Sequence, residues 1–207
     1  MSLLQRALVL VSVLCASISA AIAQSDVACT PTTPIAQQSR TKLKHRSIPA
    51  GPAPQATTIG NILKWKAPAR ISSPAVRASN SPIDPQENQI FSVSGDLQRV
   101  IMEDNDCDFH LEMSAPGAGP MADRIIVEVP QDAPYKPVRQ AILQKLAQSG
   151  ISFPAPVMVK TIPIQVTGFG FYDAFHFATA DPQRGHDHGS AFVGTLWELH
   201  PIWNVSF

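Results

Sequence analysis

Apolar and polar residues alternate along the second half of the chain with the two-residue period of β-strands. Phe109, Leu111 and Met113, for instance, alternate with polar residues, which predicts a strand with one buried and one polar face. Similar runs, bounded by Gly and Pro, predict further strands in this half of the chain. The predicted strands are 90–102, 109–113, 124–129, 162–171 and 195–207.

A helical period interrupts the strands over Ala133–Gln148, where Val138 and Ile142 lie on one face. The order of three strands, a helix and two strands is that of the OB-fold, a five-stranded β-barrel. Gly95 supports this interpretation, because a small barrel needs a first strand that bends sharply. We therefore predict a mainly β domain over Gln89–Phe207, an OB-fold-like barrel with one helix between strands three and four.

The segment Gln24–Asn88 has a different composition from the domain that follows it. It carries nine of the 19 prolines, and eight Lys and Arg residues against three Asp and Glu residues. Such a sequence offers few apolar side chains to bury and resists regular structure. It therefore predicts a disordered, basic tail or linker, in which Asn61–Lys66 forms a short apolar island that can dock on the domain.

The N-terminus has the pattern of a secretory signal peptide. Arg6 precedes the apolar stretch Ala7–Ala21, and Ala21-Ile22-Ala23 fits the small-x-small cleavage rule. The stretch is shorter than the roughly 20 residues that a transmembrane helix needs. We expect cleavage after Ala23, a secreted or periplasmic protein, and no transmembrane segment in the mature chain.

Cleavage would remove Cys15 and leave Cys29 and Cys107. In an oxidising compartment two cysteines can form a disulfide. The sequence leaves open whether this pair is bonded or remains as two thiols.

Charge and motifs exclude several classes of function. The predicted domain has seven Lys and Arg residues against 13 Asp and Glu residues, whereas a nucleic-acid groove normally shows a basic stripe with stacking aromatics. Nucleic acid is therefore not an expected partner. The chain has no CxxC, P-loop, HExxH or Gly-x-Ser-x-Gly motif, so no established catalytic signature is present.

Histidines of the domain lie close to acids in the sequence. On a strand, Glu198 and His200 share a face and lie about 7 Å apart, and polar residues from other strands can converge on the same rim. The candidate ligand or structural cluster is His110, Glu128, Asp173, His176, Glu198 and His200. These residue types suit a divalent ion such as zinc, a general acid–base pair or a buried hydrogen-bonded network, and all three interpretations remain open here.

The loop between the last two strands adds a His-x-His pair at His186 and His188, flanked by glycines. Such a pair can hold a metal ion from one short segment, and such loops are also often exposed turns. With this loop included, the candidate metal ligands are His176, His200, Asp173, His186 and His188.

Three stretches resemble a widespread family of uncharacterised secreted bacterial proteins. Residues 106–111 (Asp-Cys-Asp-Phe-His-Leu) and 126–130 (Ile-Val-Glu-Val-Pro) are similar to two of its elements. Residues 166–173, followed by His176, are similar to its Gly-x-Gly-Phe-Phe-Asp-x-x-His element, and 197–201 (Trp-Glu-Leu-His-Pro) to its terminal Glu-Leu-His-Pro. The resemblance spans the predicted domain and implies an OB-like domain in a secreted protein. The family has no assigned activity, and this chain departs from it in the 185–189 loop and in Cys107.

Three functions follow from these patterns as hypotheses. The first is a secreted binding module for a small ligand, a metal ion or a cell-envelope polymer. The second is a metal-dependent hydrolase of phosphoesterase type, with Asp173, His176 and His200 as ligands and Glu198 as the base. The third is a structural or interaction domain in which the His and carboxylate residues only stabilise the barrel.

Overall fold

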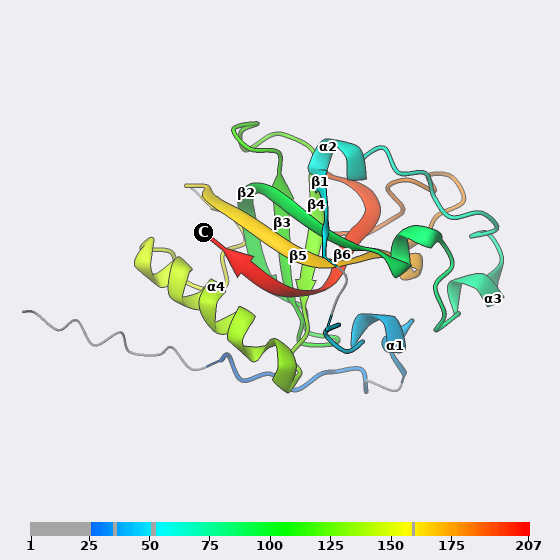
Figure 1. Cartoon of the computed structure of the whole chain (residues 1–207), viewed down its shortest axis with the longest axis horizontal. Coiled ribbons are helices and arrows are strands. Elements are labelled where there is room, and N and C mark those ends of the chain that lie inside the picture. The colour runs from blue at the N-terminus through cyan, green and yellow to red at the C-terminus, as the bar shows by residue number, and fades with distance from the viewer. Residues whose placement is uncertain (1–25, 35–36, 51–52, 159) are drawn as a thin grey trace, which may run out of the picture.

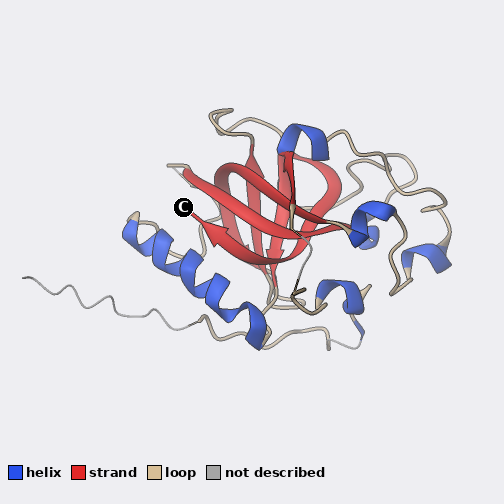
Figure 2. Cartoon of the chain, in the orientation of Figure 1, coloured by secondary structure: helices blue, strands red, loops and turns tan. Residues whose placement is uncertain are grey.

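A computed structural model of the chain describes residues 26–34, 37–50, 53–158 and 160–207. The predicted signal peptide, Met1–Ala23, lies outside the described residues. Strands make up the centre of the molecule, and the longest helix runs along one side of it (Figures 1 and 2). Among the described residues, no helix is long and apolar enough to cross a membrane.

Five strands form a closed barrel, as the sequence predicts. Their order is β2-β3-β4-β6-β5, and β5 pairs with β2 to close the ring. All pairs are antiparallel except β4 with β6. The strands are β2 (Ile90–Met102), β3 (Phe109–Ser114), β4 (Arg124–Val129), β5 (Ile162–Tyr172) and β6 (Val193–Ser206). The predicted strand ranges agree with these bounds to within two residues.

Strand β2 belongs to both sides of the barrel. It pairs with β5 over residues 90–97 and with β3 over residues 96–102. Gly95 lies just before the change of partner, and a Cβ there would lie 2.6 Å from the backbone oxygen of Ser114. Only glycine permits this close approach, so Gly95 allows the bend that closes the barrel.

The predicted helix lies between β4 and β5 as a short turn, η3 (Ala133–Tyr135), continued by α4 (Lys136–Gln148). Its residues Val138, Ile142 and Leu146 are buried in the barrel core. Arg139 is also buried on this side and stacks on the Phe109 ring, 3.6 Å from its centroid. Its guanidinium donates to two backbone carbonyls and forms an ion pair with Asp26, which compensates the buried charge.

The structure corrects the prediction of a disordered tail over Gln24–Asn88. Strand β1 (Gln55–Thr58) extends the sheet by pairing in parallel with β2. Ile59 and Ile62 are buried in the core, and the Trp65 ring lies 4.9 Å from that of Phe91. The apolar island therefore docks on the barrel, and few apolar residues suffice to anchor a Pro-rich segment. Its short helices are α1 (Thr41–Lys44), α2 (Ile59–Ile62), α3 (Pro74–Arg77) and η2 (Pro85–Asn88).

Two further links hold this segment. Arg40 and Glu87 form a fully buried ion pair, with distances of 2.6 and 2.8 Å between guanidinium nitrogens and carboxylate oxygens. Glu87 also accepts from the backbone N–H of Tyr172 at the end of β5. Cys29 and Cys107, whose pairing the sequence leaves open, form a disulfide with a Cα–Cα distance of 5.8 Å. The segment thus becomes one wall of the candidate site.

Candidate functional site

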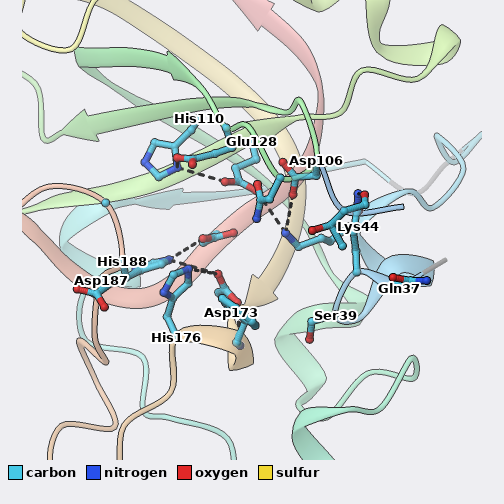
Figure 3. Close-up of a pocket in the computed structure, with 17 residues that line it drawn as sticks. Gln37, Ser39, Lys44, Asp106, His110, Glu128, Asp173, His176, Asp187 and His188 are labelled. Atoms are coloured by element: carbon cyan, nitrogen blue, oxygen red, sulfur yellow. Dashed lines mark hydrogen bonds and ion pairs between the residues drawn. The ribbon is translucent and has the colours of Figure 1, made fainter. Parts of the chain in front are cut away.

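A cavity of about 220 Å³ opens between the barrel and the N-terminal segment. Its barrel wall carries histidines and carboxylates, including His110, Glu128 and Glu198. The opposite wall carries the uncharged polar residues Thr33, Gln37, Gln38 and Ser39, and Lys44 lies beside the carboxylates. Figure 3 shows the labelled side chains converging from several elements on this space. The cavity is therefore a polar site assembled from both halves of the chain.

The first group of side chains at this cavity consists of Asp173, His188 and Glu198, which we call the outer cluster. One ligand atom from each residue lies within 4.8 Å of the others. His188 Nε2 lies 2.7 Å from Glu198 Oε1 and 3.8 Å from Asp173 Oδ2. All three residues are buried and line the cavity. The outer cluster therefore presents one imidazole and two carboxylates to a shared space.

His176 lies beside the outer cluster, with Nε2 3.7 Å from Asp173 Oδ2. Its other nitrogen, Nδ1, lies 2.8 Å from the backbone carbonyl oxygen of His186. A carbonyl only accepts, so Nδ1 carries the proton and the lone pair of a neutral ring is on Nε2. This is the orientation that metal-binding histidines normally have. His176 therefore offers a further donor atom next to Asp173, outside the three donor atoms that lie within 4.8 Å of one another.

Local backbone geometry places these side chains. Asp173 precedes η4 (Ala174–His176), and its Oδ1 accepts from the N–H of Phe175, which fixes the carboxylate. Gly189 has a φ of 72°, and a Cβ there would lie 2.8 Å from Val193 Cγ2. The glycine lets the loop pass close to the barrel, and this brings His188 against β6.

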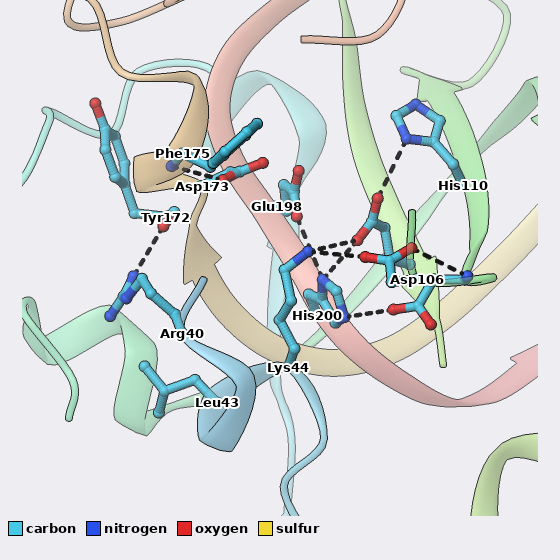
Figure 4. Close-up of polar contacts among 12 residues, drawn as sticks. Arg40, Leu43, Lys44, Asp106, His110, Tyr172, Asp173, Phe175, Glu198 and His200 are labelled. Atoms are coloured by element: carbon cyan, nitrogen blue, oxygen red, sulfur yellow. Dashed lines mark hydrogen bonds and ion pairs between the residues drawn. The ribbon is translucent and has the colours of Figure 1, made fainter. Parts of the chain in front are cut away.

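The second group consists of Asp108, Glu128 and His200, which we call the inner cluster. Its ligand atoms also lie within 4.8 Å of one another. His200 Nδ1 lies 2.7 Å from Glu128 Oε2, and His200 Nε2 lies 3.2 Å from Asp108 Oδ2. The side chains of Asp108 and His200 are completely buried. Figure 4 shows His200 between the carboxylates, with Lys44 close by.

Buried polar atoms in both clusters lack aligned hydrogen bonds. Among the described residues, none forms a hydrogen bond of acceptable geometry with either ring nitrogen of His200 or either carboxylate oxygen of Asp108. The same holds for His188 Nδ1 and Glu198 Oε2. Such atoms are costly unless another group, such as a metal ion, satisfies them. The clusters therefore differ from an ordinary hydrogen-bonded core network.

Lys44 supplies the fixed positive charge of the site. Its Nζ lies 3.3 Å from Asp106 Oδ2 and 4.0 Å from Glu128 Oε2. Burial opposes the ammonium, but Glu128, Asp173 and other nearby carboxylates outweigh burial and raise the pKa of Lys44. Burial and the neighbouring Asp108 raise the pKa of Asp106 to about 6. Lys44 is therefore a single positive charge that several neighbouring carboxylates share.

The histidines bind protons tightly in this acidic surrounding. Burial favours neutral rings, but the hydrogen bond and charge of Glu198 raise the pKa of His188, and the charge of Glu128 and other close carboxylates raises the pKa of His200. The carboxylate pKa values move the other way: although burial raises them, the nearby cations keep the pKa of Glu128 and that of Asp173 below their ordinary values. A metal ion that binds here must therefore displace protons from imidazoles.

His110 and Glu112 form a neighbouring set in which Glu112 is fully hydrogen-bonded, although His110 Nε2 is buried without a hydrogen-bond partner among the described residues. Glu112 accepts from Arg99, Arg124 and Ser190 at 2.6 to 2.9 Å. His110 Nδ1 lies 3.2 Å from Glu128 Oε1. Burial lowers the pKa of His110, but Glu112 and Glu128 outweigh it and raise the pKa to about 10. His110 therefore supports Glu128, and Glu112 anchors the loop at Ser190.

The structure divides the residues that the sequence singles out. It brings Asp173, His176 and Glu198 together with His188, and it places His200 and Glu128 in the inner cluster. The predicted ligand His186 lies outside both clusters, because its side chain is 54% exposed and faces Asp187. Its contribution is the carbonyl that orients His176.

Three site residues are missing from the candidate ligands that the sequence predicts. Asp108 lies on the predicted polar face of its strand, yet that face is buried in the structure, so the alternation did mark a site residue. Asp106 precedes this strand in a loop. Lys44 comes from the segment predicted to be disordered, and only the fold brings it to the barrel.

Comparison of the chain with protein-family models, with curated proteins and with solved structures finds no significant match.

Proposed function

We propose that this protein is an exported binding module that holds a divalent metal ion, zinc in the first place, in the outer cluster. One observation carries the proposal: donor atoms of Asp173, His188 and Glu198 come from three separate segments and lie within 4.8 Å of one another at a cavity. A shift of the His176 ring, whose Nε2 lies 3.7 Å from Asp173 Oδ2, would extend the set to two imidazoles and two carboxylates. Nitrogen and oxygen donors in this number suit zinc.

The distances within the outer cluster support this proposal. Zinc–ligand bonds are about 2.0 to 2.2 Å long, so two ligands of one ion lie about 3 to 3.5 Å apart. The distances from His188 Nε2 to Glu198 Oε1 and to Asp173 Oδ2, 2.7 and 3.8 Å, bracket this range. Small side-chain shifts would close the set around an ion.

The proposed location outside the cytoplasm rests on the signal-peptide pattern of Met1–Ala23. The Cys29–Cys107 disulfide supports it, because disulfides persist in oxidising compartments.

The cavity beside the outer cluster leaves room for a water or a small ligand on the ion. This opening favours a metal-dependent hydrolase as the second candidate, since a zinc-bound water can be activated. Activity of the zinc-loaded protein on phosphodiesters and esters would separate the two.

Titration of the chelator-treated protein with Zn²⁺ tests the proposal. We expect His188→Ala to weaken zinc binding at least tenfold, because it removes the ligand at the centre of the outer cluster. His186→Ala is the matched control: it lies two residues away, is half-exposed, and should leave the affinity within twofold. Equal zinc affinity in the wild-type protein and in His188→Ala would overturn the proposal.

A further inference from the structure

We propose that the inner cluster holds a second divalent ion and that Glu198 bridges the two ions. This inference rests on the proposed function, because it takes the outer cluster as the first site. It adds a second metal site beside the first. Glu128 and Glu198 line the cavity, whereas Asp108 and His200 do not, so the second site is closed on their side. Three observations carry it: the position of Glu198, the environment of His200, and the charge that the two clusters share.

Glu198 turns one carboxylate oxygen to each cluster. Its Oε1 lies 2.7 Å from His188 Nε2 in the outer cluster, and its Oε2 lies 3.6 Å from His200 Nδ1 in the inner cluster. Among the described residues, Oε2 has no hydrogen-bond partner although it is buried. In two-metal sites the ions lie about 3.5 to 4 Å apart, a distance that a single bridging carboxylate can span. Glu198 is placed for that role.

His200 has the surroundings of a metal ligand with a supporting carboxylate. Nδ1 faces Glu128 Oε2 at 2.7 Å and Glu198 Oε2 at 3.6 Å, while Nε2 faces Asp108 Oδ2 at 3.2 Å on the other side of the ring. A metal-binding imidazole commonly gives its second N–H to a carboxylate, which fixes the ring. Asp108 can fill this position, and His200 Nδ1, Glu128 and Glu198 then supply the ligand atoms.

The charge of the two clusters fits two ions better than one. Five carboxylates gather here, and Lys44 is the fixed cation among them. They are Asp106, Asp108, Glu128, Asp173 and Glu198. With the imidazoles of His176, His188 and His200 neutral, and the charge of His110 balanced by Glu103 at 3.4 Å, a single divalent ion and Lys44 leave two of these charges uncompensated in a buried site, which is costly. A second divalent ion compensates them.

Other charged groups face the pair from neighbouring elements. His110 on β3 contacts Glu128 from the far side, through the carboxylate oxygen that does not face His200. The Arg46 guanidinium donates to the backbone oxygen of His200 and lies over the Phe169 ring. These contacts hold Glu128 and the β6 backbone in place without taking up the ligand atoms of the inner cluster.

The test uses the purified, disulfide-bonded protein, treated with chelator and then loaded with Mn²⁺. Metal analysis should find two ions per chain, and electron paramagnetic resonance should show a spin-coupled pair instead of isolated Mn²⁺. Two uncoupled ions would overturn the bridge. One ion per chain, lost in His188→Ala, would overturn the second site and leave the proposed function standing. An absence of bound metal would overturn both.

Variants locate the second ion. His200→Ala should bind one Mn²⁺ per chain, without spin coupling, and His186→Ala should keep the coupled pair. Because His200 is fully buried, its variant can fail to fold, which near-UV circular dichroism would reveal. Asp108→Asn then serves instead: it keeps the shape of the side chain, and we expect at least tenfold weaker binding of one of the two ions. Unchanged binding of both ions in a folded variant would contradict the assignment.

Discussion

His188 Nε2 lies 2.7 Å from Glu198 Oε1, which links a glycine-flanked loop to the last strand of the barrel. This contact places an imidazole against β6, where Glu198 and His200 share one face. Glu198 thereby becomes the residue that both clusters have in common. The proposed metal binding depends on that position.

The buried ion pair between Arg40 and Glu87 should contribute strongly to stability. We expect Glu87→Gln to lower the free energy of unfolding by about 3 to 5 kcal/mol, because it leaves the Arg40 charge buried and unpaired. The exposed pair of Arg184 with Asp123 provides the control, and Arg184→Ala should cost less than about 1 kcal/mol. Urea denaturation measures both. Equal losses in the two variants would show that the N-terminal segment is not anchored as described.

The disulfide should stabilise the same segment. Cys29 and Cys107 are 78 residues apart in the sequence, so the bond closes a long loop. We expect the Cys29→Ser/Cys107→Ser double variant to lose about 2 to 4 kcal/mol. Limited proteolysis should then cut the chain before Arg40 faster than in the oxidised wild type. Reduction of the wild type should have the same effect, and cleavage at an unchanged rate would contradict the expectation.

The barrel could be predicted from the sequence because local signals specify it. Alternation fixes the five strands, the change of period marks the helix, and Gly95 marks the bend in β2. The proximity of Asp173, His176 and Glu198 could be predicted for the same reason. Asp173 and His176 follow the end of β5, and Glu198 on the neighbouring strand β6 pairs with Phe171 close to that end.

The N-terminal wall could not be predicted in this way. Arg40 reaches Glu87 and the backbone of Tyr172 across 47 and 132 residues of sequence, and no local pattern encodes such contacts. Composition alone suggested disorder, although a few buried residues such as Ile62 suffice for docking. Likewise, nothing in the His186-Asp187-His188 motif indicates which of its two histidines turns to the barrel.

The stability of the metal-free protein should depend on the protonation of His110. Its pKa is raised from 6.5 to about 10, so the charged ring stabilises the fold below pH 6.5, and this contribution is lost as the pH rises through about 10. Between pH 7 and 9 the free energy of unfolding should fall more steeply in the wild type than in His110→Gln. The difference in slope should approach about 1.4 kcal/mol per pH unit. Parallel profiles would show that His110 is neutral in the folded state.

The proposed function requires Asp173, His188 and Glu198, together with His176, to bind a divalent ion directly. X-ray absorption at the zinc edge of the zinc-loaded protein tests this most directly. We expect a first shell of nitrogen and oxygen donors at about 2.0 to 2.2 Å, together with outer-shell scattering from imidazole rings that diminishes in His188→Ala. Zinc surrounded by oxygen alone, without imidazole scattering, would contradict it.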